Sequence, residues 1–311
     1  MRKLVSILIL TVTLVLPQTA FAWNATGHQL VASIAWDNLS DTAKGNTIAL
    51  LMKAPSGACF PRLSTGNSSS LSARERLLFM KTATWPDIVR PRGQDDTRPC
   101  KKFHRRDWHF VDFFWSGFSG DTTNPPQNLD RPIADINAVE RLMLFRPFVV
   151  SNNADADRAI NLAWILHLVG DIHQPLHASG RVTSTELDGD QGGNLFLLNN
   201  GNKLHGYWDN IVDNANRRKN TETFDAYLIR LTAELQTKYP KSHFGNLEAT
   251  QFEKWARESV KLAQDNAYPR SLKRGQSPSP TYQGNTLDVS EEAIAQAGYR
   301  MADLLEGLFG H

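Results

Sequence analysis

The chain has 311 residues, of which 41% are hydrophobic, and a formal net charge of +2. This length suits one large domain or two ordinary ones. A nearly neutral chain excludes binding of nucleic acid through bulk charge alone, so any attraction to a polyanion must be local.

The first 22 residues have the pattern of a secretory signal peptide. Arg2 and Lys3 form a basic start, an apolar run covers 4–16, and Ala20-Phe21-Ala22 is a small-x-small cleavage site. We therefore predict signal peptide 1–22, cleaved after Ala22, and a secreted or periplasmic domain over 23–311. Loss of the two basic residues would reduce the net charge from +2 to 0. No later apolar run reaches about 18 residues, so we expect no membrane segment.

The remaining chain predicts a mainly α fold, a single helical domain with one small β-hairpin. Apolar residues recur at helical spacing, and Gly, Ser and Pro separate the helices. The extended aromatic stretch 108–113 is expected to pair with 194–197 as a hairpin. Helices are predicted at 25–38, from Ser40 or Asp41 to before Pro55, and at 71–83, 131–147, 154–172, 203–214, 221–238, 249–264 and 289–308. Loops are predicted at 56–70, 91–102, 116–130, 178–193 and 268–287.

The sequence contains two cysteines, Cys59 and Cys100. Two cysteines in a secreted chain fit one disulfide, and two separate free thiols are the alternative. The sequence leaves this choice open.

Two histidine–aspartate pairs are the strongest chemical signal. His167 precedes Asp171, and His205 precedes Asp209, by four residues each. On a helix, residues four apart lie on one face, so each pair presents imidazole and carboxylate together. These are zinc-type ligands, and His177 follows the first pair closely. Five candidate ligands exceed the needs of one zinc ion and indicate a cluster of metals. Two helices that bury His–Asp hydrogen bonds are the alternative.

Other candidates are weaker when taken alone. A free α-amino group at a mature Trp23 can ligate zinc together with His28 on the next turn. Asp87 also fits an ordinary helix N-cap, and Arg90 an ordinary surface charge. His109 lies between aromatic residues and fits a core histidine. By contrast, His173 is assigned a role in the structure or in the support of a ligand.

Taken together, these motifs resemble the S1/P1-type zinc-dependent single-strand-specific nucleases over nearly the whole mature chain. The fold implied is the helical one shared with zinc-dependent phospholipases C. The motifs are Trp23 with Gly27-His28, Trp85-x-Asp87-x-x-Arg90, Trp108-His109-Phe110-x-Asp112, His167-x-x-x-Asp171-x-His173-Gln174-Pro175-x-His177, Gly192-Gly193-Asn194 and His205-x-x-Trp208-Asp209.

The resemblance implies three Zn²⁺ ions and assigns their ligands. One ion would bind Asp87, His109, His167 and Asp171; a second His177, His205 and Asp209; and the third Trp23, His28 and the shared Asp171. Arg90 would stabilise the phosphate. Phe110 would stack on a base, Asp112 would hydrogen-bond it, and Asn194 would lie near the scissile phosphate.

The implied activity is hydrolysis of single-stranded DNA and RNA to products with 5′-phosphates, by a protein that we expect to be a monomer. Zinc lowers the pKa of bound water to about 7, which supplies the nucleophile at neutral pH. Stacking on Phe110 requires an unpaired base, and single strands offer one at little cost. The sequence leaves open whether the enzyme prefers RNA or DNA and whether it has 3′-nucleotidase activity.

Two other functions fit part of the pattern. A phospholipase C shares the implied fold and an N-terminal Trp, but its last ligand is typically Glu, whereas this chain has Asp209. A periplasmic zinc-buffering protein is the non-enzymatic alternative. Ligands divided among three ions leave positions open for water, which suits catalysis better than storage.

Overall fold

A computed structural model of the protein describes residues 23–63, 70–116 and 136–311. The predicted signal peptide 1–22 lies outside the described residues, as do parts of the predicted loops 56–70 and 116–130 and the start of the predicted helix 131–147.

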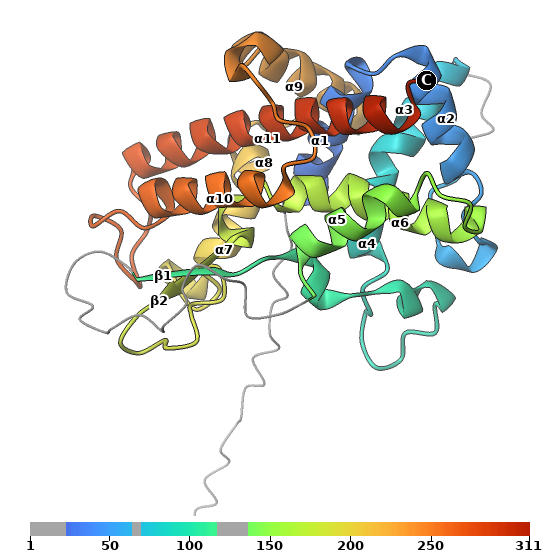
Figure 1. The fold of residues 1–311 in the computed structure, drawn as a ribbon. Helices are drawn as coiled ribbons and strands as arrows, with labels where there is room; N and C mark the ends of the chain where they lie inside the picture. Colours follow the sequence, from blue (N-terminus) through green and yellow to red (C-terminus); the bar gives the residue numbers. More distant parts are fainter. Residues whose placement is uncertain (1–22, 64–69, 117–135) are drawn as a thin grey trace, which may run out of the picture.

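The prediction of a mainly helical fold is confirmed. Two short strands, β1 (Phe113–Ser116) and β2 (Ser179–Val182), form a small sheet at one end of the molecule (Figure 1). The helices are α1 (Ala25–Asp37), α2 (Asp41–Leu51), α3 (Leu71–Thr82), α4 (Trp85–Ile88), α5 (Ala138–Phe148), α6 (Asp155–Asp171), α7 (Leu204–Asp209), α8 (Ile211–Ala215), α9 (Phe224–Lys238), α10 (Phe252–Leu262) and α11 (Pro280–Phe309).

Side-chain caps fix the start of several helices. Asn24 accepts a hydrogen bond from the Gly27 N–H at the start of α1, and Ser40 accepts one from the Ala43 N–H at the start of α2. Each cap satisfies a backbone donor that has no partner within the helix. The predicted starts of these two helices near 25 and 41 are therefore confirmed.

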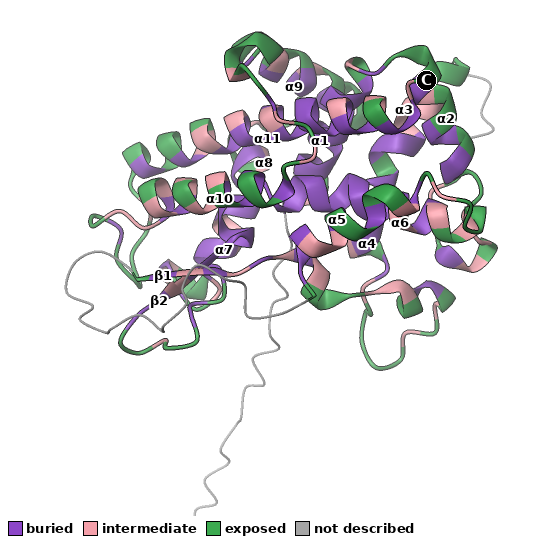
Figure 2. Ribbon diagram, in the orientation of Figure 1, coloured by how far each residue is buried: buried purple, intermediate pink, exposed green. Residues whose placement is uncertain are grey.

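Helix α6 lies at the centre of the helical layer. It packs against α1, α2, α3, α4, α5 and α11, while the long α11 runs along α1 (Figure 1). Its second half is buried without interruption from Leu162 to Asp171, and Figure 2 shows this burial shared by α1 and the inner face of α11. Polar side chains at the end of α6 therefore lie in the interior and need partners there.

The predicted hairpin between 108–113 and 194–197 is wrong. Strand β1 pairs instead with β2, in parallel, with Phe113 opposite Ser179. The pairing begins earlier, because the Val111 N–H donates to the His177 carbonyl at 2.9 Å. Close approach is possible because Gly180 has no side chain: a Cβ there would lie 2.9 Å from the Phe114 ring. The segment after Asn194 turns back toward α7, where the Leu204 N–H donates to the Phe196 carbonyl at 2.9 Å.

Prolines account for two further corrections. The predicted loop 268–287 ends early because α11 begins at Pro280, capped by Ser279, rather than at 289. Proline is tolerated in the first helical turn, where its missing N–H would have no helical partner. For the same reason Pro86 lies in the first turn of α4, a short helix that we did not predict. Helix α10 ends near its predicted boundary and continues as a π-helical turn, Ala263–Ala267.

The structure decides between a disulfide and two free thiols. Cys59 and Cys100 form a disulfide that closes a separation of 41 residues. The bridge joins two short 3-10 turns, Ser56–Ala58 and Pro99–Phe103, in the predicted loop regions on either side of α3 and α4. It therefore tethers the segments that flank Asp87.

Among the described residues, none of the helices combines the length and the apolar character that crossing a membrane requires.

Candidate metal centre

The predicted metal ligands converge from distant parts of the chain. His28 comes from α1, Asp87 from α4, and His109 and His177 from short 3-10 turns at Arg106–His109 and Pro175–His177. The two pairs predicted from spacing lie on α6 and α7. The structure groups these side chains in three sets whose ligand atoms lie within 4.8 Å of one another: His28, Asp87 and His167; His109, His167 and Asp171; and His177, His205 and Asp209.

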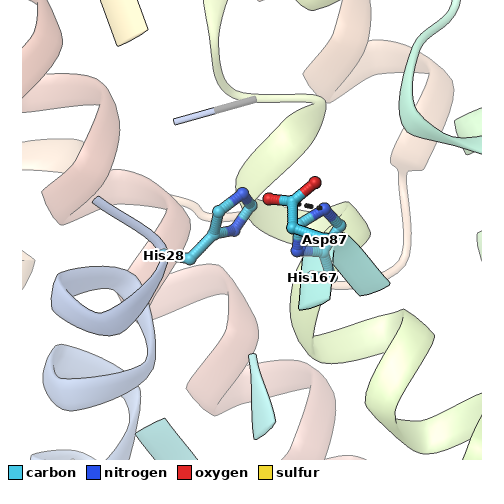
Figure 3. Close-up of side chains that lie close together, drawn as sticks. All are labelled: His28, Asp87 and His167. Atoms are coloured by element: carbon cyan, nitrogen blue, oxygen red, sulfur yellow. Dashed lines mark ion pairs between the residues drawn. The ribbon is translucent and has the colours of Figure 1, made fainter. Parts of the chain in front are cut away.

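Asp171 contacts histidines of the first two sets. One carboxylate oxygen lies 3.2 Å from both His109 Nδ1 and His167 Nε2, and the other lies 3.3 Å from His28 Nε2. Asp87 lies at the rim, 4.0 Å from His167 Nε2. Figure 3 shows His28, Asp87 and His167 pointing toward one another from three different helices. The first and third ligand groups that the resemblance implies therefore form one continuous cluster.

The third set contains two imidazoles whose Nε2 atoms face each other. His177 Nε2 lies 3.0 Å from His205 Nε2. Each ring also has its Nδ1 within 2.7 Å of a backbone carbonyl, that of His109 for His177 and that of Gly192 for His205. A carbonyl only accepts, so each Nδ1 carries the ring proton and each Nε2 of a neutral ring presents a lone pair. Two lone pairs at this distance require a cation or an additional proton between them.

The first cluster repeats this pattern. The His167 Nδ1–H donates to the Ala83 carbonyl at 2.8 Å, so Nε2 of the neutral ring would present a lone pair 2.9 Å from His109 Nδ1. Both nitrogens of His28, one oxygen of Asp87 and one oxygen of Asp171 are buried with no hydrogen-bond partner among the described residues. Buried polar atoms without partners are costly, and a divalent cation would satisfy them. The donor set of nitrogens and carboxylate oxygens fits zinc.

Charge in this cluster is balanced by the chain's own groups. Burial acts to lower the pKa of His167, but Asp171 and Asp87 outweigh it and raise the pKa to about 9. Burial acts to raise the pKa of Asp171, yet the charge on His167 and hydrogen bonds from the imidazoles hold that pKa well below its usual range. Burial and the nearby His167 lower the pKa of His28 to about 4. A metal ion and a proton on His167 therefore compete for the same carboxylate.

Asp209 differs from Asp171. Burial raises its pKa well above the usual range, even though the Gln174 side chain donates a hydrogen bond to it at 2.6 Å. A bound cation would stabilise the charged form of Asp209, which is the form that ligates metal.

Comparison with known proteins assigns the chain to a family. The model of the S1/P1 nuclease family matches residues 23–310. The chain belongs to the S1/P1 nuclease family. It is 26% identical to Endonuclease 4 of Arabidopsis thaliana over 93% of this chain and 90% of that protein. It is 24% identical to Nuclease S1 of Aspergillus oryzae over 94% of each chain. A third relative, Endonuclease 5 of Arabidopsis thaliana, is 31% identical, but the match spans only 48% of this chain and 50% of that protein.

Family membership makes the chain a nuclease, a hydrolase of phosphodiester bonds. It favours the nuclease over the phospholipase C and over a protein that only buffers zinc. The resemblance expected from the motifs is confirmed over nearly the whole mature chain.

The sequence motifs assign no role to several groups that hold the candidate ligands in place. Gln174 fixes Asp209 through its amide, as described above. Three backbone carbonyls, those of Ala83, His109 and Gly192, set the tautomers of His167, His177 and His205. The backbone acceptors carry no side-chain signature, so only the fold reveals them.

His173 has the structural role that we predicted. Its Nδ1–H donates to the Val169 carbonyl at 2.7 Å, and its Nε2 accepts from Arg300 at 2.9 Å. Arg300 is itself buried and pairs with Glu258 at 2.6 Å. His173 is thereby committed to the interface between α6, α10 and α11, outside the three ligand sets.

Trp23 is fully buried beside the centre. The next residue, Asn24, donates its backbone N–H to the Asp209 carbonyl at 3.2 Å, so the start of the described chain adjoins α7. A Cβ on Gly27 would lie 2.6 Å from the Trp23 Cβ, so glycine permits the indole to fold back against α1. This position is compatible with the ligand role that the resemblance implies for Trp23.

Two of the predicted substrate-binding residues adjoin the cluster. Arg90 lies 3.9 Å from Asp87, and Phe110 directly follows the candidate ligand His109 and is half-buried. Burial and the nearby Asp190 raise the pKa of Asp112 to about 7. Asn194 donates to the Gln191 carbonyl at 2.8 Å, while its side-chain oxygen is buried with no hydrogen-bond partner among the described residues.

One glycine makes a testable contribution to the nuclease site. A Cβ on Gly170 would lie 2.7 Å from His28 Nδ1. We expect Gly170→Ala to displace His28 and to lower metal affinity and turnover by about 10- to 100-fold, as loss of a ligand's support usually does. The matched control is Gly284→Ala on α11, where a Cβ would meet nothing within 4 Å. It should keep full activity and gain about 0.5–1 kcal/mol of stability. Equal activity of the two variants, measured with their zinc content, would contradict this role for Gly170.

Proposed function

We propose that this nuclease is a secreted or periplasmic, zinc-dependent endonuclease that hydrolyses single-stranded DNA and RNA to products with 5′-phosphates. The observation that carries the proposal is the facing imidazole nitrogens of His177 and His205, 3.0 Å apart, next to the Asp171 cluster. Together they offer buried lone pairs and carboxylates for several cations.

The proposed ligands of three Zn²⁺ ions are those of the family pattern. When bound, the ions would supply Lewis acidity, which activates water and neutralises charge on phosphate oxygens. One set is Asp87, His109, His167 and Asp171, a second is His177, His205 and Asp209, and a third is Trp23, His28 and Asp171. His28 also lies within reach of Asp87 and His167, so the first and third sets share a boundary.

The chain's other residues position the substrate. The Arg90 guanidinium, held near Asp87, offers a planar fork to the non-bridging phosphate oxygens as charge builds on them. Asn194 carries a side-chain oxygen without a hydrogen-bond partner among the described residues, which can accept a hydrogen bond. Asp112 can hydrogen-bond a base that stacks on Phe110.

The test of the proposed function compares one oligonucleotide with its own duplex. The zinc-loaded mature protein should cleave the single strand, made as DNA or as RNA, far faster than the duplex and leave 5′-phosphate ends. Hydrolysis of phosphatidylcholine with no cleavage of the single strand would overturn the proposal, as would equal rates on the strand and the duplex.

The stacking role of Phe110 predicts a selective loss of affinity. Removal of one base–aromatic stack costs roughly 1–3 kcal/mol, which corresponds to an increase in KM of about 5- to 150-fold. We therefore expect Phe110→Ala to raise KM for a single strand within this range. Phe224 on α9 is an exposed phenylalanine and provides the control, since Phe224→Ala should leave KM unchanged. A normal KM for Phe110→Ala would refute stacking.

Signal-peptide cleavage after Ala22 would create the α-amino group that the third set uses. One additional residue before Trp23 should therefore lower zinc content and activity, because an amide nitrogen is a poor ligand. Mass spectrometry of the secreted protein establishes the cleavage site. Full zinc loading and full activity of the extended form would exclude the amine as a ligand.

A further inference from the structure

A basic hollow lies beside the metal centre. Its volume is about 360 Å³, and four cationic side chains and two aromatic rings line it: Arg181, Arg270, Lys273, Arg274, Phe196 and Tyr268. No acidic side chain lines it among the described residues. Because the mature chain is nearly neutral overall, such a local concentration of positive charge is a specific feature of this surface.

The wall of this hollow touches the ligand-bearing loop. A Cβ on Gly193 would lie 3.2 Å from the Tyr268 hydroxyl and 3.4 Å from the backbone nitrogen of His205. Tyr268 also donates to Asp190 at 2.7 Å, at the start of the turn that carries Gly193 and Asn194. Gly193 therefore lies between the Tyr268 hydroxyl and the His205 backbone.

The hollow is held in shape by backbone hydrogen bonds. The Gly275 N–H donates to the Leu197 carbonyl at 2.9 Å, and the Asn199 N–H donates to the Gln276 carbonyl at 3.2 Å. These bonds tie the segment that carries Arg270 and Lys273 to the segment that carries Phe196. A preformed site loses little entropy when it binds a ligand.

The four cations have different roles. Arg274 pairs with Glu186 at 2.7 Å and covers the Phe196 ring at 4.7 Å, and Arg181 covers the Tyr268 ring at 5.0 Å. These two arginines build the wall. Arg270 and Lys273 are exposed. Among the described residues, neither side chain has a hydrogen-bond partner or an ion-pair partner. Their charges remain available to a ligand.

We propose that this basic hollow is a strand-binding subsite, which takes a backbone phosphate of the polynucleotide at a nucleotide beyond the scissile bond. Arg270 and Lys273 contact the phosphate, and the edges of Phe196 and Tyr268 contact the adjoining sugar or base. This inference rests on the proposed function, because it assigns the path of the same strand outside the metal cluster. It predicts that long strands bind more tightly than the shortest substrates.

The test compares two substrates in one double variant. Arg270→Ser/Lys273→Ser should raise KM for a single strand of about 30 nucleotides by about 5- to 10-fold at low salt, with kcat unchanged. Hydrolysis of a dinucleotide, which has no phosphate beyond the scissile one, should not change. Loss of one phosphate contact should also reduce the slope of log KM against log salt by about 0.7. The control Lys53→Ser/Lys219→Ser removes the same number of exposed cations elsewhere and should match the unmodified enzyme on both substrates.

Several outcomes would overturn the subsite. One is an unchanged KM for the long strand, and another is an equal loss on the dinucleotide with a lowered melting temperature. Binding of inorganic phosphate that the variant loses, without any change in KM for the strand, would show a free-anion site instead. Failure of the proposed function is distinguishable, because the unmodified enzyme would then cleave neither substrate.

Discussion

Replacement of Asp171 by asparagine is expected to lower the rate of phosphodiester hydrolysis by about a thousandfold or more. Asp171 is fully buried and lies within 3.3 Å of His28, His109 and His167, so its two oxygens serve both halves of the first cluster. Asparagine keeps the shape but loses the charge that holds a divalent cation. A loss of about 4 kcal/mol of transition-state stabilisation corresponds to this decrease in rate. Turnover of a single strand and zinc content per chain measure it.

The same helix provides a control for this substitution. Asp157 lies in the first turn of α6 and is exposed. Asp157→Asn changes the net charge by the same amount and should leave both zinc content and turnover unchanged. If Asp171→Asn kept its full complement of zinc and even a tenth of the activity, Asp171 would not be the shared ligand.

Removal of the metals is expected to destabilise the fold as well as abolish activity. The cluster joins α1, α4, α6 and α7, and without a cation the His177 and His205 Nε2 atoms, 3.0 Å apart, need an additional proton between them. A ligand that binds only the folded state raises the free energy of unfolding by about 4 kcal/mol when its concentration is a thousand times its Kd. The melting temperature should therefore fall by on the order of 10 °C after chelation, and zinc should restore it.

Two histidine variants locate this effect. In His205→Gln the shift in melting temperature on chelation should be smaller, because one ligand set is already incomplete. In His243→Gln it should be of normal size, because His243 is exposed and pairs with Glu292 far from the cluster. A chelated protein that melts at the temperature of the zinc-loaded one would contradict a structural role for the metals.

Local spacing was sufficient to predict the ligand pairs within helices. His167 and Asp171 share one face of α6, and His205 and Asp209 share one face of α7, because four residues correspond to about one helical turn. Their convergence with His28, Asp87 and His109 is a tertiary property. The resemblance of the motifs predicts this convergence, whereas helical periodicity does not.

Contacts between distant segments account for what the sequence left hidden. His109 and His177 are neighbours because the chain before β1 pairs in parallel with the chain before β2. The alternation of apolar and polar residues predicts a strand but not the strand with which it pairs. The role of Gly170 depends on a ring from α1 that no local pattern places there. Proline also suits turns, so the sequence around Pro280 predicts a loop. Only the Ser279 cap and the packing of α11 show that a helix begins there.

The central claim is that the His/Asp clusters hold the metal ions that perform the hydrolysis. Elemental analysis of the purified mature protein, combined with a single-strand cleavage assay on the same sample, tests it most directly. We predict three zinc atoms per chain, and activity that falls and recovers in proportion to zinc as the metal is withdrawn and returned. Undiminished cleavage by a preparation with less than one metal atom per chain would contradict the claim.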